Sequence, residues 1–138
     1  MKRNRIRQYV GSTSLMLAVL GLSSIAAFAQ GTFAVVPTWD GITVCSGKPI
    51  SSPSPGFSVS GVPAGTTELE FRMTDLDSPR FAHGGGKVGF TGQQAIAPGA
   101  FTFIGPCPPQ KHRYEWTVTA RDAAGKSLGV VRAVKTYP

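Results

Sequence analysis

Hydrophobic and polar residues alternate most regularly in two segments of the chain, 67–75 and 112–120. Successive side chains of a β-strand point to opposite faces, so alternation of this kind predicts antiparallel strands with one buried and one solvent-exposed face. The predicted buried residues are Leu69, Phe71 and Met73 in the first segment and Tyr114, Trp116, Val118 and Ala120 in the second.

Polar groups stand where each predicted buried face reaches the end of its strand. Continuing the buried parity of the first segment leads to Asp75 and Asp77, and extending that of the second backwards leads to His112 ahead of Tyr114. If the two strands are neighbours, these four side chains converge. They are therefore the first candidates for a functional site.

Short segments separated by Gly and Pro make up the rest of the chain. After residue 29 no helical period is longer than about two turns, and turn signals recur every eight to twelve residues or so. We expect strands at 33–36, 42–45, 57–60 and 128–137 and a hairpin turn at 122–126. The segment 46–56 is expected to be a loop, and 81–99 a loop with a weak strand near 87–91. This pattern predicts an all-β fold, an antiparallel β-sandwich with few or no helices after residue 29.

The N-terminus has the pattern of a secretory signal peptide. Basic residues at 2, 3, 5 and 7 precede an apolar run at 15–27, and Ala27-Phe28-Ala29 is a small-x-small cleavage site. We expect cleavage after Ala29, which leaves one domain over residues 30–138 in the periplasm or outside the cell. The apolar run is shorter than the roughly 20 residues of a membrane-spanning helix, so the mature protein is expected to have no membrane span.

The positive charge of the full chain comes largely from this N-terminal segment. Four of the 14 Lys and Arg residues lie in 1–29, so the expected mature domain carries 10 basic and 7 acidic residues, a net charge of +3. No run of basic residues is left after residue 29. Nucleic acid is therefore not an expected partner.

Two cysteines, Cys45 and Cys107, follow the expected cleavage site. An even pair of cysteines in an oxidising compartment predicts a disulfide. The alternative is two buried free thiols, because cysteine is also a small apolar residue. Their spacing does not fit a C-x-x-C redox or zinc motif.

Three blocks of the sequence resemble motifs of the phosphatidylethanolamine-binding protein (PEBP) family, in its bacterial Raf-kinase-inhibitor-like branch (YbhB/YbcL). They cover about residues 42–125. The matching blocks are Asp75-Leu76-Asp77-Ser78-Pro79; Gly105-Pro106-Cys107-Pro108-Pro109 followed by His112-Arg113-Tyr114; and Cys45-Ser46-Gly47 ahead of Ser54-Pro55-Gly56-Phe57.

The resemblance implies a β-sandwich with a small pocket for phosphate-like anions or phospholipid head groups, with no cofactor and no enzymatic turnover. His83 is the candidate for the family's second pocket histidine. In the family pattern this histidine is followed by tryptophan, whereas here it is followed by Gly84. The implied ligand-binding residues are Asp75, Asp77, Pro79, His83, Gly105, Pro106, Pro108, Pro109, His112 and Tyr114.

The chemistry of these residues fits an anion only in part. His112 and Tyr114 offer hydrogen-bond donors to a phosphate. Asp75 and Asp77 oppose an anion unless they orient the histidine and the tyrosine, and they also suit a primary amine. In a purely structural alternative Asp77 caps the turn at Pro79, Asp75 pairs with Arg113, and no ligand binds.

The same residues leave two other functions open. Asp75, Asp77, His83 and His112 are residue types that bind divalent metals, which would suit a small metal-assisted hydrolase. Alternatively, the proline-rich loop at 105–109 would be presented to an enzyme by an inhibitor, and the partner would then be a protein.

Overall fold

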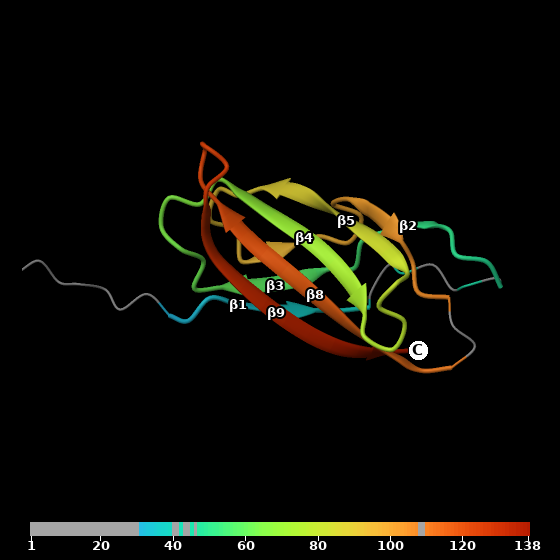
Figure 1. Ribbon diagram of the computed structural model, residues 1–138. Coiled ribbons are helices and arrows are strands. Elements are labelled where there is room, and N and C mark those ends of the chain that lie inside the picture. The colour runs from blue at the N-terminus through green and yellow to red at the C-terminus, as the bar shows by residue number, and fades with distance from the viewer. Residues whose placement is uncertain (1–30, 40–41, 43–44, 46, 108–109) are drawn as a thin grey trace, which may run out of the picture.

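The computed structural model describes residues 31–39, 42, 45, 47–107 and 110–138 (Figure 1). This part of the chain contains strands and no helix, as the sequence predicts. The strands are β1 (Ala34–Pro37), β2 (Ser51–Pro53), β3 (Phe57–Ser60), β4 (Glu68–Asp75), β5 (Ala82–Gly89), β6 (Ala95–Ile96), β7 (Thr102–Ile104), β8 (His112–Arg121) and β9 (Ser127–Tyr137).

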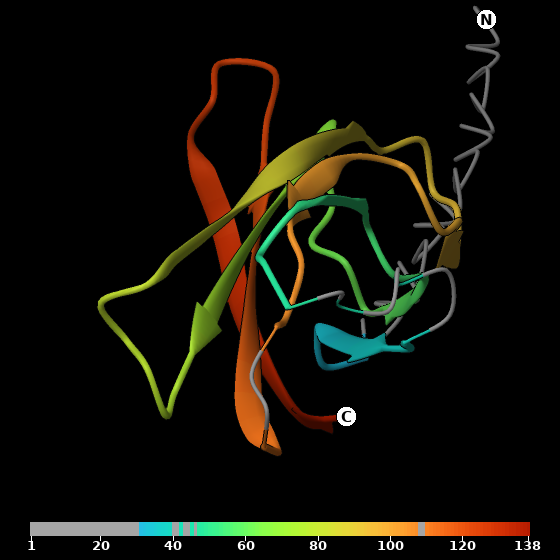
Figure 2. The ribbon, with the colours of Figure 1, turned by 90° about the vertical axis from the view of Figure 1, so that its right-hand side faces the viewer.

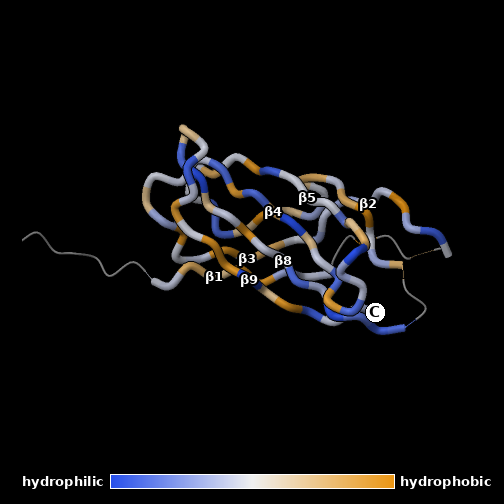
Figure 3. Tube along the Cα trace, viewed as in Figure 1, coloured by the Kyte–Doolittle hydropathy of each residue, from blue (hydrophilic) through white to orange (hydrophobic). Residues whose placement is uncertain are grey.

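The largest sheet has the strand order β5-β4-β8-β9, and all its pairs are antiparallel. The two segments with the clearest alternation, β4 and β8, are neighbours at its centre. Met73 lies opposite Trp116 and Asp75 opposite Tyr114. Hydrophobic and hydrophilic residues alternate along these strands (Figure 3). The two segments are therefore neighbours, which is the condition under which the candidate side chains at their ends were expected to converge.

Two smaller sheets, β1-β3-β6 and β2-β7, cover one face of the large sheet. Figure 2 shows the red to yellow-green strands of the large sheet on one side and the cyan to green segments of the small sheets on the other. The core lies between these layers. Its buried hydrophobic residues are Val35, Phe57, Val59, Leu69, Phe71, Met73, Ile96, Phe103, Tyr114, Trp116, Val118 and Ala120.

Aromatic rings join the layers around Trp116, which is fully buried. Its ring centroid lies 5.1 Å from that of Phe57 on β3 and 5.3 Å from that of Phe103 on β7. Phe71 on β4 also packs on Phe57, at 4.6 Å. Large aromatic side chains dominate core energetics, so these contacts bind the small sheets to the large one.

The glycine-rich segment corrects one expectation, because residues 82–89 form a full strand and not a loop with a weak strand near 87–91. The glycines are needed for packing. A Cβ on Gly85 would overlap the backbone oxygen of Phe71, and a Cβ on Gly86 would overlap the side chain of Phe101. Glycine inside a strand often marks such a close approach.

Other boundaries differ in smaller ways. The expected loop at 46–56 contains β2, and the first strand is shifted by one residue to Ala34–Pro37. Ile42 and Cys45 are not in a strand, and 43–44 lie outside the described residues. The predicted turn at 122–126 is confirmed by hydrogen bonds from the amides of Ala124 and Lys126 to Asp122 Oδ1, both 2.9 Å.

The predicted signal peptide, 1–29, lies outside the described residues, so its cleavage stays a prediction. Within the part of the chain that the structure describes, no helix is long and apolar enough to cross a membrane.

Candidate functional site

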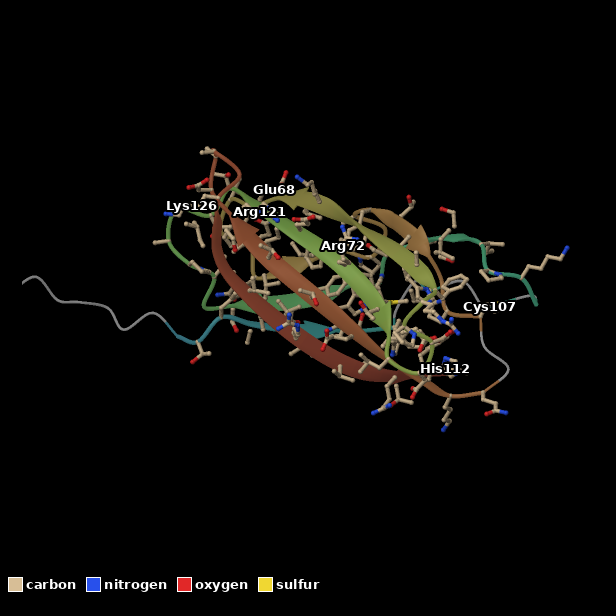
Figure 4. All side chains as sticks on the ribbon, in the orientation of Figure 1. Glu68, Arg72, Cys107, His112, Arg121 and Lys126 are labelled. Atoms are coloured by element: carbon tan, nitrogen blue, oxygen red, sulfur yellow. A yellow bond between two sulfur atoms is a disulfide. The ribbon has the colours of Figure 1, made fainter. Side chains whose placement is uncertain are left out.

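The candidate site lies at the end of the large sheet where β4 finishes and β8 begins. The register places Asp75, the last residue of β4, opposite Tyr114. His112 precedes Tyr114 by two positions, on the same side of the strand. Figure 4 shows His112 and Cys107 near this end, away from Glu68 and Arg121 at the other.

Asp75 is buried, with 4% of its surface exposed, and its carboxylate has three partners nearby. Oδ1 accepts hydrogen bonds from the backbone amides of Asp77 (2.8 Å) and Ser78 (3.0 Å). Oδ2 lies 2.6 Å from Nδ1 of His112. A carboxylate accepts a hydrogen bond from Nδ1–H, so Asp75 orients the imidazole and leaves its Nε2 for a ligand.

Asp77 binds Arg113 and does not line the cavity. Its Oδ1 lies 2.7 Å from Nη2 of Arg113, and its Oδ2 accepts the backbone amide of Arg113 at 2.7 Å. These hydrogen bonds from Arg113 lower the pKa of Asp77 to about 2. The purely structural alternative had Asp77 capping the turn and Asp75 pairing with Arg113. The structure shows the reverse: Asp75 caps the turn and Asp77 pairs with Arg113.

His83 enters the site from the neighbouring strand β5. Its Nδ1 lies 2.7 Å from the carbonyl oxygen of Ile104, and only 3% of its surface is exposed. The ring packs edge to face on Tyr114, with centroids 5.6 Å apart, and also contacts Phe81 at 4.6 Å. His83 therefore belongs to the same cluster as Tyr114 and His112.

Tyr114 is fully buried, and its hydroxyl has no hydrogen-bond partner among the described residues. Burial raises the pKa of the phenol, and the negative charge of Asp75 raises it further. The hydroxyl stays protonated at neutral pH and is available as a donor.

These side chains surround a cavity of about 210 Å³. Four of the predicted site residues line it: Asp75, His83, His112 and Tyr114. The other lining residues are Pro49, Ser78, Phe81 and Cys107. The sequence reasoning missed the first three as site residues and had assigned Cys107 to the disulfide, inside the proline-rich block. Of these, Ser78 and Cys107 are the two with a signal in the sequence, because they lie inside the Asp-x-Asp-x-Pro and Gly-Pro-Cys-Pro-Pro blocks.

The remaining predicted residues do not line this cavity. Pro79 is exposed beside the turn, and Gly105 and Pro106 are buried behind the wall. The Gly105 amide donates to Ile50 O at 3.0 Å, and a Cβ at this position would come within 2.6 Å of the Ser52 hydroxyl. Pro108 and Pro109 lie outside the described residues.

A disulfide joins Cys45 to Cys107, with the Cα atoms 5.0 Å apart, which confirms the predicted pairing. Cys107 lines the cavity and Cys45 comes shortly before Pro49, another lining residue. The disulfide therefore ties together two segments that form one wall of the cavity.

The four residues considered as metal ligands do not form a common group. Asp77 is directed to Arg113, away from the other three. Among the described residues no three His, Cys, Asp or Glu side chains are gathered in a way that would hold a metal ion.

Comparisons with known proteins relate the chain to others through its fold. No protein-family model matches the sequence, and no curated protein matches it. The structure is similar to the crystal structure of E. coli YbcL, described as a new member of the mammalian PEBP family, with a TM-score of 0.56 and 18% sequence identity. The match covers 78% of this chain and 98% of the YbcL chain. The chain therefore has the fold of the PEBP family, whose motifs its sequence resembles.

Proposed function

We propose that the protein binds a small phosphate-like anion, as a free ion or as the head group of a phospholipid, in the cavity at the end of β4 and β8. Binding occurs without turnover of the ligand. One observation carries the proposal: a histidine and a tyrosine that both offer hydrogen bonds lie in one cavity whose nearby carboxylates are already occupied.

The negative charges of Asp75 and Asp77 would repel an anion, but both carboxylates already have hydrogen-bond partners in the protein. Arg113 neutralises Asp77 outside the cavity, and Asp75 already accepts two backbone amides besides contacting His112. When His112 is protonated it forms an ion pair with Asp75 at 2.6 Å, and its Nε2 offers a charged donor to the ligand. Asp75 is therefore less available to a primary amine than a carboxylate without these partners would be.

The size of the cavity favours a head group over a larger ligand. Its volume of about 210 Å³ is below the roughly 300–1,000 Å³ of pockets that enclose drug-sized molecules. A phosphate with a short substituent fits a cavity of this volume, and a lipid tail would have to stay outside.

The test is a titration of the purified protein with phosphate and with phosphoethanolamine, followed through the His112 ring by NMR. Both ligands are expected to shift the His112 resonances in a saturable way, and phosphoethanolamine is expected to be recovered unchanged. His112→Gln should weaken binding by about tenfold or more, because a charge-assisted hydrogen bond is lost.

Arg132→Gln is the matched control, because it removes a positive charge that pairs with Glu115 on the sheet, outside the cavity. It should leave the affinity unchanged. A His112 signal that does not respond to either ligand, together with unchanged thermal unfolding, would rule out the proposed function.

We also propose that the protein acts outside the cytoplasm. The Cys45–Cys107 disulfide supports an oxidising compartment. Mass spectrometry of the exported protein should find Gln30 as the first residue, and an intact N-terminus on the exported protein would contradict the predicted signal peptide.

A further inference from the structure

The Ile104 carbonyl decides which nitrogen of His83 carries the proton. A carbonyl oxygen can only accept a hydrogen bond, so Nδ1 of His83, at 2.7 Å, must be the donor. In the neutral ring Nε2 is then an acceptor with a free lone pair. The polar atom that His83 has left for the cavity is therefore an acceptor.

Two buried polar atoms of the cavity lining lack a protein partner. Nε2 of His83 and the hydroxyl of Tyr114 have no hydrogen-bond partner among the described residues. Leaving buried polar groups unpaired is costly, so such atoms call for an explanation. Trp116 Nε1 is also unpaired, but it lies in the aromatic core and does not line the cavity.

The two atoms without a partner, His83 Nε2 and the Tyr114 hydroxyl, differ in their hydrogen-bonding role. Burial keeps the Tyr114 phenol protonated, so it is a donor, and His83 Nε2 is an acceptor. The two rings are adjacent, with centroids 5.6 Å apart. A single ligand that satisfies both must present an acceptor and a donor, as the P=O and P–OH groups of a protonated phosphate do.

We propose that the cavity selects a phosphate-type ligand in its protonated, monoanionic form, with its P–OH donating to His83 Nε2 and a P–O oxygen accepting from Tyr114. The inference rests on the proposed function and narrows its ligand class. A dianion would bring two negative charges towards Asp75 and oxygen lone pairs towards the His83 lone pair. The titratable groups that line the cavity are Asp75, His83, His112 and Tyr114, and of these Asp75 carries a negative charge.

The test compares three ligands by calorimetry at about pH 7. Methylphosphonate is chosen because it holds its second proton more tightly than a phosphate monoester, whose second pKa is about 6. Its monomethyl ester is a monoanion without the P–OH, and sulfate is a dianion without a proton. Methylphosphonate should bind more tightly than either, on the order of tenfold, the factor that one hydrogen bond supplies.

Two variants assign this preference to the two side chains. His83→Phe keeps a ring but removes Nε2, so the ratio of methylphosphonate to ester affinity should fall to about one. Because this change also removes the bond to Ile104, Tyr114→Phe is a second variant that deletes one hydroxyl with no protein partner among the described residues. It should weaken methylphosphonate binding while the fold stays intact.

The tautomer of His83 can also be measured directly by NMR, without any ligand. In ¹⁵N-labelled free protein, His83 should be protonated at Nδ1 and unprotonated at Nε2. A proton on Nε2, or sulfate or the ester binding as tightly as methylphosphonate, would overturn the inference but leave anion binding standing. If none of the three ligands binds, the inference and the proposed function both fail.

Discussion

At the scale of single residues, Asp75 and Asp77 have the same side chain and lie two positions apart, yet they bind different partners. Asp75 ends β4 on its buried face, where its carboxylate meets two backbone amides and His112. Asp77 follows the strand, so strand alternation no longer directs it, and it reaches Arg113 instead. Because the strand ends between them, Asp75 lines the cavity whereas Asp77 forms an ion pair with Arg113 at the surface.

The ion pair of Asp77 predicts a loss of stability in acid. The pKa of Asp77 is lowered from 3.8 to about 2 in the folded protein, so its contribution is complete above 3.8 and disappears as the pH falls towards 2. Asp77→Asn should lower the melting temperature at neutral pH, and the difference from the unchanged protein should shrink over that interval.

Thermal unfolding of both proteins across this pH range checks the prediction. Arg113→Gln is the matched variant: it should show the same pH dependence, and the double variant should lose little more than either single one. A difference that stays constant down to pH 2 would show that the ion pair is not its cause.

At the scale of elements, β5 is built from a sequence with little strand propensity. Ala82–Gly89 contains four glycines, and glycine is depleted in strands because it has no side chain to pack. The strand forms because its backbone pairs with β4 and because Gly85 and Gly86 allow close approach of Phe71 and Phe101. Tertiary packing overrides local preference here, and it also brings His83 into the site.

A matched pair of substitutions on β5 separates packing from propensity. A Cβ at Gly86 would lie 2.4 Å from Cβ of Phe101, whereas a Cβ at Gly89 meets nothing within 4 Å. Gly86→Ala should destabilise the fold by about 1–3 kcal/mol through overpacking. Gly89→Ala should be neutral or slightly stabilising because it restricts the unfolded chain.

Denaturant unfolding of the two variants gives both free energies. Equal effects at the two positions would contradict the packing explanation for the glycines of β5.

At the scale of the whole molecule, one fully buried tryptophan and one disulfide connect parts far apart in the sequence. Trp116 contacts rings from both small sheets, Phe57 and Phe103. The Cys45–Cys107 bond spans 62 residues and joins two segments of the cavity wall. Stability and the shape of the site therefore depend on the same long-range links.

Removing the disulfide should weaken both. Closing a loop of 62 residues stabilises by about 4 kcal/mol in the chain-entropy model. The double variant Cys45→Ser/Cys107→Ser should therefore melt at a lower temperature and bind phosphate less tightly. A dithiol reductant should produce the same changes in the unaltered protein and none in the double variant. Full phosphate affinity in a folded, reduced protein would show that the disulfide does not hold the cavity wall.

The strand pattern of β4 and β8 could be read from the sequence because side chains alternate with a period of two. That period identified the buried faces of Phe71 and Trp116, and it placed Asp75 and His112 at the ends of those faces. The resemblance to the family motifs added the fold family and His83. Cys45 and Cys107 were predicted to pair because they are an even pair in a domain that is expected to be exported.

Only the tertiary structure decided which partner each polar side chain of the site binds. Alternation assigns a face but no partner, so it could not show that Asp77 leaves the cavity for Arg113, or that Ile104 holds His83 in one tautomer. These contacts join residues 36 and 21 positions apart. Sheet pairing and packing bring such residues together. The sequence alone therefore determined the central strands β4 and β8 and one edge of the site, while the fold determined which polar groups meet there.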